Sequence, residues 1–329
     1  ILIGAWREVY RMNDRPLPGL SGDRSQPLVS RLVSDYQHRK ERRRKGAREA
    51  RRIKGADSVI FSPGNSGRTW LRSMLTSLLQ IHYGLDSAPL IDFDNVHKLD
   101  SRVPQILVTH NRWLPYYRKQ RPGRECATYY DSNLLVLVRN PLDTCVSQYF
   151  QWLHRSKDYN VLLKQWPARS TAMTLGEFLD HPVTGVGRLC DELNMWLRES
   201  EKIRHAKFVR YEDLLLDTQG KLKEIADFLH LPVSKGIVRE AAELNSFENM
   251  QRREVSGHPA AAPDSPKQDE VKLTEALKAR KGKIGGYSRE INEERCLYYQ
   301  ELVRHRLSRE FGYYDLPTIM PMNLPGHLK

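Results

Sequence analysis

The chain has 329 residues, of which 40% are hydrophobic, and this composition excludes a globally disordered protein. No stretch is apolar for long enough to span a membrane, and the formal net charge of +13 is concentrated in one segment. The four cysteines lie far apart and no N-x-[ST] acceptor is present, so we expect a reducing, cytoplasmic setting without a disulfide framework.

Residues 1–55 are predicted to form a basic N-terminal extension. The opening ILIGAW has no methionine, and we interpret it as an ordinary amphipathic start rather than the remnant of a signal or anchor. Residues 37–54 (QHRKERRRKGAREARRIK) hold ten basic residues and two glutamates, a local charge of +8. This run fits a solvated, partly helical leader; association with an anionic membrane surface stays open, and nucleic acid is a less favoured partner.

Residues 56–329 are predicted to form one domain in which short apolar strands alternate with helices. We expect strands at SVIF (58–61), QILVT (105–109), NLLVLV (133–138) and KFVRYEDLL (207–215). Continuous apolar strands are typical of a parallel sheet covered on both faces. The expected fold is therefore α/β, a three-layer sandwich around a central parallel sheet, with ligands at the carboxyl ends of the strands.

Three amphipathic helices are expected after these strands. The first follows SVIF, with an apolar face formed by Leu71, Met74, Leu75, Leu78 and Leu79. The second starts at Pro141 with Val146, Phe150 and Leu153 facing inward, and the third is GKLKEIADFL (220–229). Residues 251–272 are polar and rich in proline and alanine, which predicts a mobile loop or lid.

The loop SPGNSGRTWL (62–71) resembles the phosphate loop of nucleotide hydrolases but lacks its lysine. A glycine-containing loop between a strand and a helix forms a nest of backbone N–H groups that binds phosphate or sulfate. Ser66, Arg68 and Thr69 can add side-chain donors. The alternative is that the glycines serve the turn alone.

Two further segments carry groups that suit an anion. In RNPLDTCVS, Arg139 ends a predicted strand and Ser147 lies on the next helix, where both can hold a phosphate. The alternative for this segment is an Arg139–Asp143 pair with a solvated serine. In ARKGKIGGY (279–287), Arg280, Lys281 and the Gly282 N–H can form a cationic clamp, although this composition is common in loops.

Together with YED (211–213) and NSFENM (245–250), these segments resemble, over residues 57–314, the sulfotransferases that use 3′-phosphoadenosine 5′-phosphosulfate (PAPS). The resemblance implies that GNSGRTW (64–70) cradles the phosphosulfate and that the arginine segments bind the 3′-phosphate. It also implies that Trp70 and Phe247 sandwich the adenine beside Tyr211. The implied nucleotide-binding set is Gly64, Asn65, Ser66, Gly67, Arg68, Thr69, Trp70, Arg139, Ser147, Tyr211, Ser246, Phe247, Arg280, Lys281 and Gly282.

The resemblance further implies a catalytic histidine after an early strand, which is His110 in VTHNRW. A neutral imidazole there can take the proton of an acceptor hydroxyl, and the alternative is a histidine that caps the strand. Asn65 and Val108 replace two lysines of the family pattern, and Asn65, at the position of the catalytic lysine, is counted with His110 and Arg68 among the catalytic candidates. Because negative charge builds on the leaving phosphate, Arg68 is the first substitute and Arg112 the second. A protein that binds the nucleotide without catalysis also stays open.

The expected function is transfer of a sulfuryl group from PAPS to a hydroxyl of a carbohydrate, lipid or small alcohol, with release of adenosine 3′,5′-bisphosphate (PAP). No acidic strand end suits magnesium, and we expect no metal requirement. A divergent P-loop kinase and a basic nucleotide- or nucleic-acid-binding protein are the alternatives, and homodimerisation stays open. Residues 149–166 and 251–272 are expected to line the acceptor pocket; its aromatic candidates, which can equally be core, are Tyr116, Tyr117, Phe150, Trp152 and Tyr159.

Overall fold

The computed structural model describes residues 28–117, 122–246, 248–250, 252 and 284–314. Its helices and strands, in chain order, are α2 (Leu28–Gly55), β1 (Ser58–Phe61), α3 (Arg68–Tyr83), β2 (Ile106–Thr109), α4 (Leu114–Tyr117), β3 (Asn133–Val138), α5 (Pro141–His154), α6 (Asp158–Leu163), α7 (Leu175–Asp180), α8 (Val186–Ser200), β4 (His205–Arg210), α9 (Tyr211–Leu216), α10 (Thr218–Phe228), α11 (Lys235–Leu244) and α14 (Glu293–Arg306). Short 3₁₀ turns lie at Ala127–Tyr129, Arg169–Thr171, Gly286–Arg289 and Arg309–Phe311.

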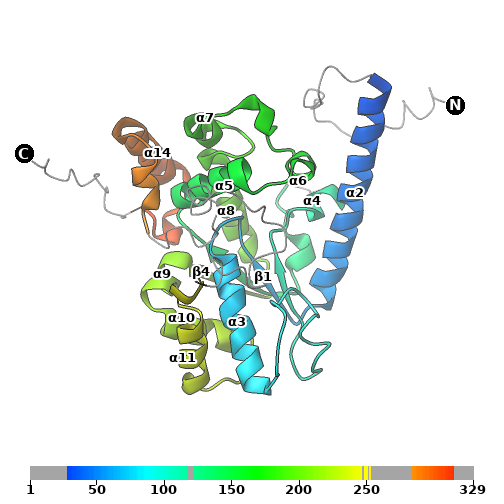
Figure 1. Cartoon of the computed structure of the whole chain (residues 1–329), viewed down its shortest axis with the longest axis vertical. Coiled ribbons are helices and arrows are strands. Elements are labelled where there is room, and N and C mark those ends of the chain that lie inside the picture. The colour runs from blue at the N-terminus through cyan, green and yellow to red at the C-terminus, as the bar shows by residue number, and fades with distance from the viewer. Residues whose placement is uncertain (1–27, 118–121, 247, 251, 253–283, 315–329) are drawn as a thin grey trace, which may run out of the picture.

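The four strands form one parallel sheet in the order β2-β1-β3-β4. Every residue of β1 and β2 is buried, as expected for continuous apolar strands that are covered on both faces. Because β1 is a central strand, the loop that follows it lies between the ends of β2 and β3. The sheet with its flanking helices confirms the predicted α/β sandwich (Figure 1).

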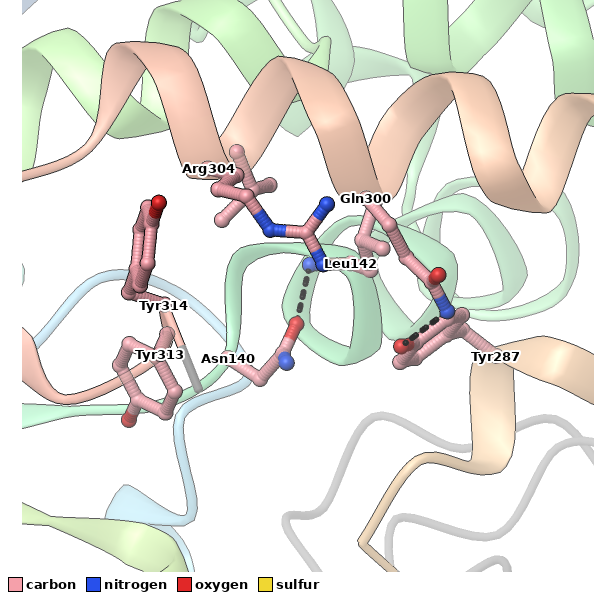
Figure 2. A pocket seen from close by; sticks show the side chains of 8 residues that line it. Asn140, Leu142, Tyr287, Gln300, Arg304, Tyr313 and Tyr314 are labelled. Atoms are coloured by element: carbon pink, nitrogen blue, oxygen red, sulfur yellow. Dashed lines mark hydrogen bonds between the residues drawn. The ribbon is translucent and has the colours of Figure 1, made fainter. Parts of the chain in front are cut away.

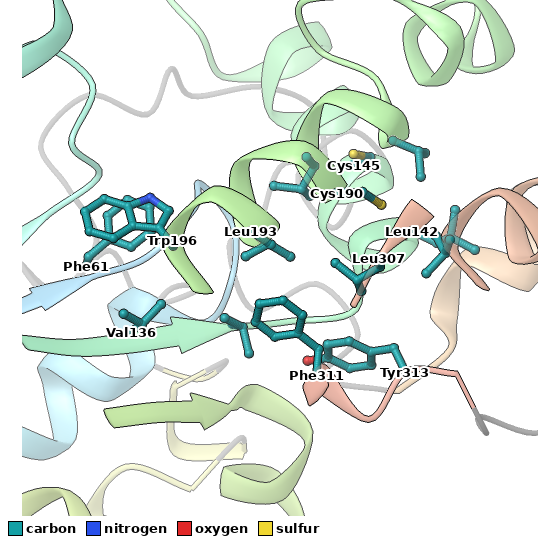
Figure 3. Packing of buried hydrophobic residues seen from close by; sticks show 14 of the residues in the cluster. Phe61, Val136, Leu142, Cys145, Cys190, Leu193, Trp196, Leu307, Phe311 and Tyr313 are labelled. Carbon is teal, nitrogen blue, oxygen red and sulfur yellow. The ribbon is translucent and has the colours of Figure 1, made fainter. Parts of the chain in front are cut away.

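Each face of the sheet has its own hydrophobic core. Alternate residues of β1 point to opposite faces, so Ile60 packs in the core with α3, α10 and α11, whereas Val59 and Phe61 pack in the core with α5, α8 and α14. In the second core, Trp196 of α8 stacks on Phe61 with ring centroids 4.1 Å apart (Figure 3). The two cores hold the carboxyl ends of the strands in register.

Most of the predicted elements are confirmed. The strands at 58–61 and 133–138 have the predicted bounds, β2 begins one residue later than predicted, and the five apolar residues of the α3 face are all buried. On α5, Val146 is buried and Phe150 packs partly against the core. The prediction for Leu153 is wrong, because this side chain is 38% exposed.

The second half of the fourth predicted strand is also wrong. Strand β4 ends at Arg210, and the following YEDLLL forms the helix α9. The Glu212 carboxylate is buried, where it accepts hydrogen bonds from the Asn140 backbone N (2.9 Å) and the Tyr313 hydroxyl (2.7 Å). These distant partners and the acidic residues in the first helical turn favour a helix start over a longer strand.

The basic run lies within α2, which packs along the domain instead of standing free (Figure 1). Ala50 and Ile53 are buried in the core that contains Phe61 and Trp196. A Cβ added at Gly46 would lie 2.4 Å from the Trp113 carbonyl oxygen, next to α4. The Arg42 guanidinium donates to the carbonyls of Leu162 and Leu163. The domain boundary at residue 55 stays a prediction.

The structure leaves the predicted loop at 251–272 almost wholly undescribed, and it describes the helices that bear on membrane crossing. Of residues 251–272, only residue 252 is described, so the predicted loop lies outside the described residues. None of the helices in the described part of the chain is both long and apolar enough to cross a membrane.

Candidate active site

The loop after β1 has the strand–loop–helix form that its sequence predicts. Asn65 and Gly67 have positive φ angles of 68° and 89°, and α3 begins at Arg68. A Cβ at Gly67 would lie 2.3 Å from Cδ2 of Tyr211, so only glycine lets this ring pack on the loop. The Ser66 hydroxyl is buried and finds no partner among the described residues, which suits a loop that receives an anion.

Gly64 and Asn65, in the middle of the loop, form hydrogen bonds with residues of α5. The Asn65 side-chain amide donates to the Ser147 carbonyl (2.9 Å) and hydroxyl (3.0 Å), and Gln148 donates to the Gly64 carbonyl (2.9 Å). Arg139 Nη1 donates to the Asn65 carbonyl at 3.2 Å. Three predicted residues from two separate motifs are thus in contact, and Asn65 holds the loop where the family pattern has a lysine.

Arg139 retains donor capacity for an anion. Its guanidinium lies 4.7 Å above the Tyr211 ring, and its buried Nε has no partner in the described residues. The pair with Asp143 is long, 4.0 Å, because the Asp143 carboxylate instead accepts from the backbone N of Gly285 (2.8 Å) and Tyr287 (3.1 Å). Burial raises the pKa of Asp143 although Arg139 opposes the shift. The alternative of a simple Arg139–Asp143 ion pair is therefore only partly present.

The residues expected near the adenine are described in part. Trp70 and Tyr211 meet edge to face, with ring centroids 5.8 Å apart, and Trp70 Nε1 donates to the Asn245 carbonyl at 2.7 Å. Only 9% of Trp70 is exposed, so its ring is held firmly beside the loop. Thr69 follows Arg68 in the first turn of α3, and the half-buried Ser246 follows Asn245. Four predicted residues lie outside the described residues: Phe247, Arg280, Lys281 and Gly282.

His110 follows β2 and faces the same loop. Its Nδ1 lies 2.7 Å from the Ser62 carbonyl oxygen. A carbonyl only accepts hydrogen bonds, so the proton of the neutral imidazole is on Nδ1 and Nε2 keeps its lone pair. Burial, reinforced by Arg68 and Arg112, holds the pKa of His110 well below its usual range. The ring is therefore neutral near pH 7 with Nε2 available as a base, although the contact with Ser62 also suits a strand cap.

Three basic side chains act electrostatically on His110. Burial lowers the pKa of Arg68 to about 9 and that of Arg112 to about 10, values at which both guanidinium groups stay charged near neutral pH. Arg112 Nη2 lies 3.7 Å from the position of a Cβ added at Gly64, which puts this guanidinium beside the loop. The third basic side chain is Lys164, whose Nζ lies 4.6 Å from the Trp166 ring centroid; burial lowers its pKa to about 7, so it is only partly protonated near neutral pH. Sequence reasoning missed Lys164, because no local pattern links it to Arg112.

A cavity of about 360 Å³ opens beside these groups. It lies between α2 and the end of β2 and is lined by Lys45, Arg48, Glu49, Arg52, Arg68, Asp92, Leu107, Val108, Thr109, His110, Arg112 and Trp113. None of residues 149–166, which were expected to line the acceptor pocket, belongs to this lining. Trp152 is fully buried against Val161 and Phe178, so the packing alternative is right for this residue.

A second cavity lies beside α5 and α14. This cavity of about 20 Å³ next to Asn140 and Tyr287 is large enough for about one water molecule (Figure 2). In it the Asn140 side chain accepts from the Leu142 N–H, and Gln300 donates to the Tyr287 hydroxyl. Within the described residues, no group of three or more His, Cys, Asp or Glu side chains is placed to hold a metal ion.

The family to which these features belong is a sulfotransferase family. Residues 56–311 match the family model described as the sulfotransferase domain, so the chain is a member of that family, as the motifs indicate. It is 26% identical over 214 residues to cytosolic sulfotransferase 3 of Arabidopsis thaliana, covering 61% of this chain and 63% of the relative. To cytosolic sulfotransferase 15 of the same plant it is 30% identical over 229 residues, covering 61% and 60%. The matched region thus spans about three-fifths of these relatives.

Solved structures with a similar course of the chain include two bound to PAP. One is mouse sulfotransferase SULT7A1 complexed with PAP, with 20% identity, a TM-score of 0.47 and coverage of 79% of this chain and 86% of that chain. The other is retinol dehydratase in a complex with retinol and PAP, with 15% identity, a TM-score of 0.48 and coverage of 77% and 81%.

Proposed function

We propose that the protein transfers a sulfuryl group from PAPS to the hydroxyl group of an acceptor and releases PAP. The observation that carries this proposal is the meeting of three motifs at the carboxyl ends of β1, β2 and β3. The loop 62–67, His110 and Arg139 come from separate parts of the chain, yet the loop contacts both of the others. Membership of the sulfotransferase family supports the same reaction.

The proposed nucleotide site uses groups that are ready to bind an anion. Residues 64–70 would hold the 5′-phosphosulfate through the backbone N–H groups at the start of α3 and the unpaired Ser66 hydroxyl. Arg139 and Ser147, joined by Arg280, Lys281 and Gly282, would bind the 3′-phosphate. The adenine would lie beside Trp70, Tyr211, Ser246 and Phe247.

In the proposed reaction, the acceptor oxygen bonds to sulfur while the bond between sulfur and the bridging phosphate oxygen breaks. The acceptor proton moves to Nε2 of His110, which is unprotonated because the Ser62 carbonyl holds the proton on Nδ1. Arg68 and Arg112 would stabilise the charge that develops on the leaving phosphate. Asn65 contributes no charge, and its contacts with Ser147 support a positioning role.

We propose a cytoplasmic enzyme that needs no metal ion. The relatives carry the name cytosolic sulfotransferase, and the cysteine pattern of this chain agrees with a reducing compartment. Carbohydrates, lipids and small alcohols are the acceptor classes we consider. Membrane-surface association through residues 37–54 and homodimerisation stay predictions.

Nucleotide binding provides the first test of this function. PAP is expected to raise the melting temperature of the full chain far more than ATP does, because the proposed site binds a 3′-phosphate that ATP lacks. A ligand at 100 times its Kd stabilises a folded protein by about 2.7 kcal/mol. Equal shifts with the two nucleotides, or magnesium-dependent ATP turnover, would favour the divergent kinase. Incubation with labelled PAPS and a cell extract should then yield a labelled acceptor.

A further inference from the structure

The sheet order separates the two sides of the phosphosulfate loop. On the β3 side the loop contacts Arg139 and Ser147, the residues proposed to hold the nucleotide. On the β2 side it contacts His110, and there the cavity of about 360 Å³ opens under α2. The cavity therefore lies where an acceptor hydroxyl must approach His110. Its volume is within the range of small-molecule sites.

The lining of this cavity is strongly basic. Five cations, Lys45, Arg48, Arg52, Arg68 and Arg112, face two carboxylates, which leaves a net charge of +3. A neutral sugar or phenol has no need of such a lining. Bringing like charges together around a small space is unfavourable unless an anion occupies it.

The two carboxylates are already engaged by the protein. Glu49 accepts hydrogen bonds from the Thr109 hydroxyl and from the backbone N of Trp113 and Leu114. Asp92 forms an ion pair with Arg52 at 3.0 Å. Asp92 acts electrostatically on Arg68 and Glu49 on Arg112, but within the described residues neither acid forms an ion pair with Lys45 or Arg48.

The remaining cations divide into an inner and an outer pair. Arg68 and Arg112 are the inner pair, which acts on His110, and the proposed reaction already uses them at the leaving phosphate. Lys45 and Arg48 are the outer pair on α2. Lys45 lies 4.9 Å from the Trp113 ring centroid and 3.8 Å from Glu41, and Arg48 has no ion pair or hydrogen bond with any residue that the structure describes.

We propose that the acceptor is a small hydroxyl compound that carries an anionic group, a carboxylate, sulfate or phosphate, and that Lys45 and Arg48 bind this group. The proposal rests on the proposed function, which makes the cavity beside His110 the acceptor site. It gives α2 a direct role in substrate selection: one face of the basic helix recognises the acceptor. The outer cations hold the anionic end while the hydroxyl lies next to Nε2 of His110.

Matched acceptors test this proposal on the full-length chain. The pairs 4-hydroxyphenylacetate with 4-hydroxyphenylacetamide, and glucuronate with glucuronamide, differ in one carboxylate. Transfer from labelled PAPS measures kcat/KM, and titration of the PAP-bound protein measures Kd without any turnover. In at least one pair the acid is expected to be preferred by roughly tenfold, the worth of one charge-assisted hydrogen bond.

Variants on α2 assign the preference to the cavity. Arg48→Gln and Lys45→Gln should each reduce the preference, and Arg48→Glu should reverse it towards the amide. Arg51→Gln is the matched control, because Arg51 is an exposed arginine of the same helix outside the cavity lining. Equal affinity for acid and amide in the wild type, no binding of either acid, or a preference that survives the double substitution of Lys45 and Arg48 would overturn the proposal.

The proposed function fails by a different result. If PAP does not bind the wild type and no sulfuryl transfer occurs, the sulfotransferase assignment is lost. The ratio of the Kd values for acid and amide is measured by a second titration, carried out without PAP. Selective acid binding that depends on Arg48 would then still support an anion site under α2.

Discussion

Arg68 is the residue whose surroundings best suit the cation that the proposed reaction needs at the leaving phosphate. It starts α3, lines the cavity and acts electrostatically on His110. Its guanidinium has no hydrogen-bond acceptor or ion-pair partner within the described part of the chain, and burial lowers its pKa without removing its charge at neutral pH. A buried cation without a partner costs free energy in the unliganded protein, which an incoming negative charge would repay.

Arg68→Ala is therefore expected to retain PAP binding and to lower kcat by about 100-fold or more, the usual effect of removing one transition-state donor. Steady-state kinetics and a PAP thermal-shift titration measure the two effects separately. Arg68→Lys should recover part of the rate because it restores the charge. Full activity in Arg68→Ala would exclude the proposed role and direct attention to Arg112 or Lys164.

His110 predicts a particular pH dependence. Its folded pKa lies well below 6.5, so kcat/KM should stay constant as the pH falls to 6.5 and decline only at more acidic values. Below pH 6.5 the unfolded chain binds a proton that the folded chain does not. Stability should therefore decrease as the pH falls, by at most about 1.4 kcal/mol per pH unit from this group.

The variant His110→Asn separates catalysis from strand capping. If His110 is the general base, the variant should lose transfer activity. In urea unfolding it should also lose the part of the pH dependence of stability between pH 5 and 7 that comes from His110. A variant that is less stable but retains kcat would support the capping alternative.

At the scale of the element, the loop 62–67 depends on close packing as much as on its backbone conformation. Gly67 has a positive φ, and a side chain there would run into the Tyr211 ring. The Arg139 guanidinium packs on the same ring, at 4.7 Å from its centroid. A displaced Tyr211 would therefore disturb the loop and the proposed 3′-phosphate site together.

Gly67→Ala is expected to destabilise the protein by about 2 kcal/mol or more and to weaken PAP binding. The matched control is Gly123→Ala, because Gly123 has a similar φ of 70° but no atom within 4 Å of an added Cβ. The difference between the two variants in urea unfolding and PAP titration isolates the contact with Tyr211. Equal effects would mean that backbone strain alone accounts for the loss.

At the scale of the whole molecule, α2 closes the β2 side of the sheet. Glu49 is the main polar link, since its buried carboxylate joins α2 to Thr109 at the end of β2 and to the start of α4. Ala50 and Ile53 add apolar contacts with the core. The cavity wall thus depends on how the helix docks, and the basic residues of α2 are positioned by this link.

Glu49→Ala should lower the free energy of unfolding by about 3 kcal/mol, because two backbone N–H groups lose their acceptor. Glu41→Ala is the control, since Glu41 lies on the same helix and, among the described residues, forms ion pairs only with Arg44 and Lys45. Chemical denaturation of both variants measures the difference. A loss no larger than that of the control would mean that α2 is held by its apolar contacts.

The sequence by itself determined strands β1, β2 and β3 to within one residue, the strand–loop–helix unit that contains loop 62–67, and the family, because these depend on patterns between near neighbours. Strands 58–61 and 133–138 are apolar throughout, and the turn residues of the loop lie directly before an amphipathic helix. The loop 62–67, His110 and Arg139 each directly follow an apolar strand in the sequence. Because the strands are parallel, their carboxyl ends lie at one edge of the sheet, and motifs far apart in the sequence come together there.

Only the tertiary structure decided what covers the site. The fourth strand ends at Arg210 because Glu212 finds partners at Asn140 and Tyr313, each far away in the sequence. Burial lowers the pKa of Lys164 and the nearby charge of Arg112 adds to this shift, and α2 becomes a cavity wall through Glu49 and the α4 region. A basic run looks the same in sequence whether it is solvated or docked, since the difference lies in contacts that only folding creates.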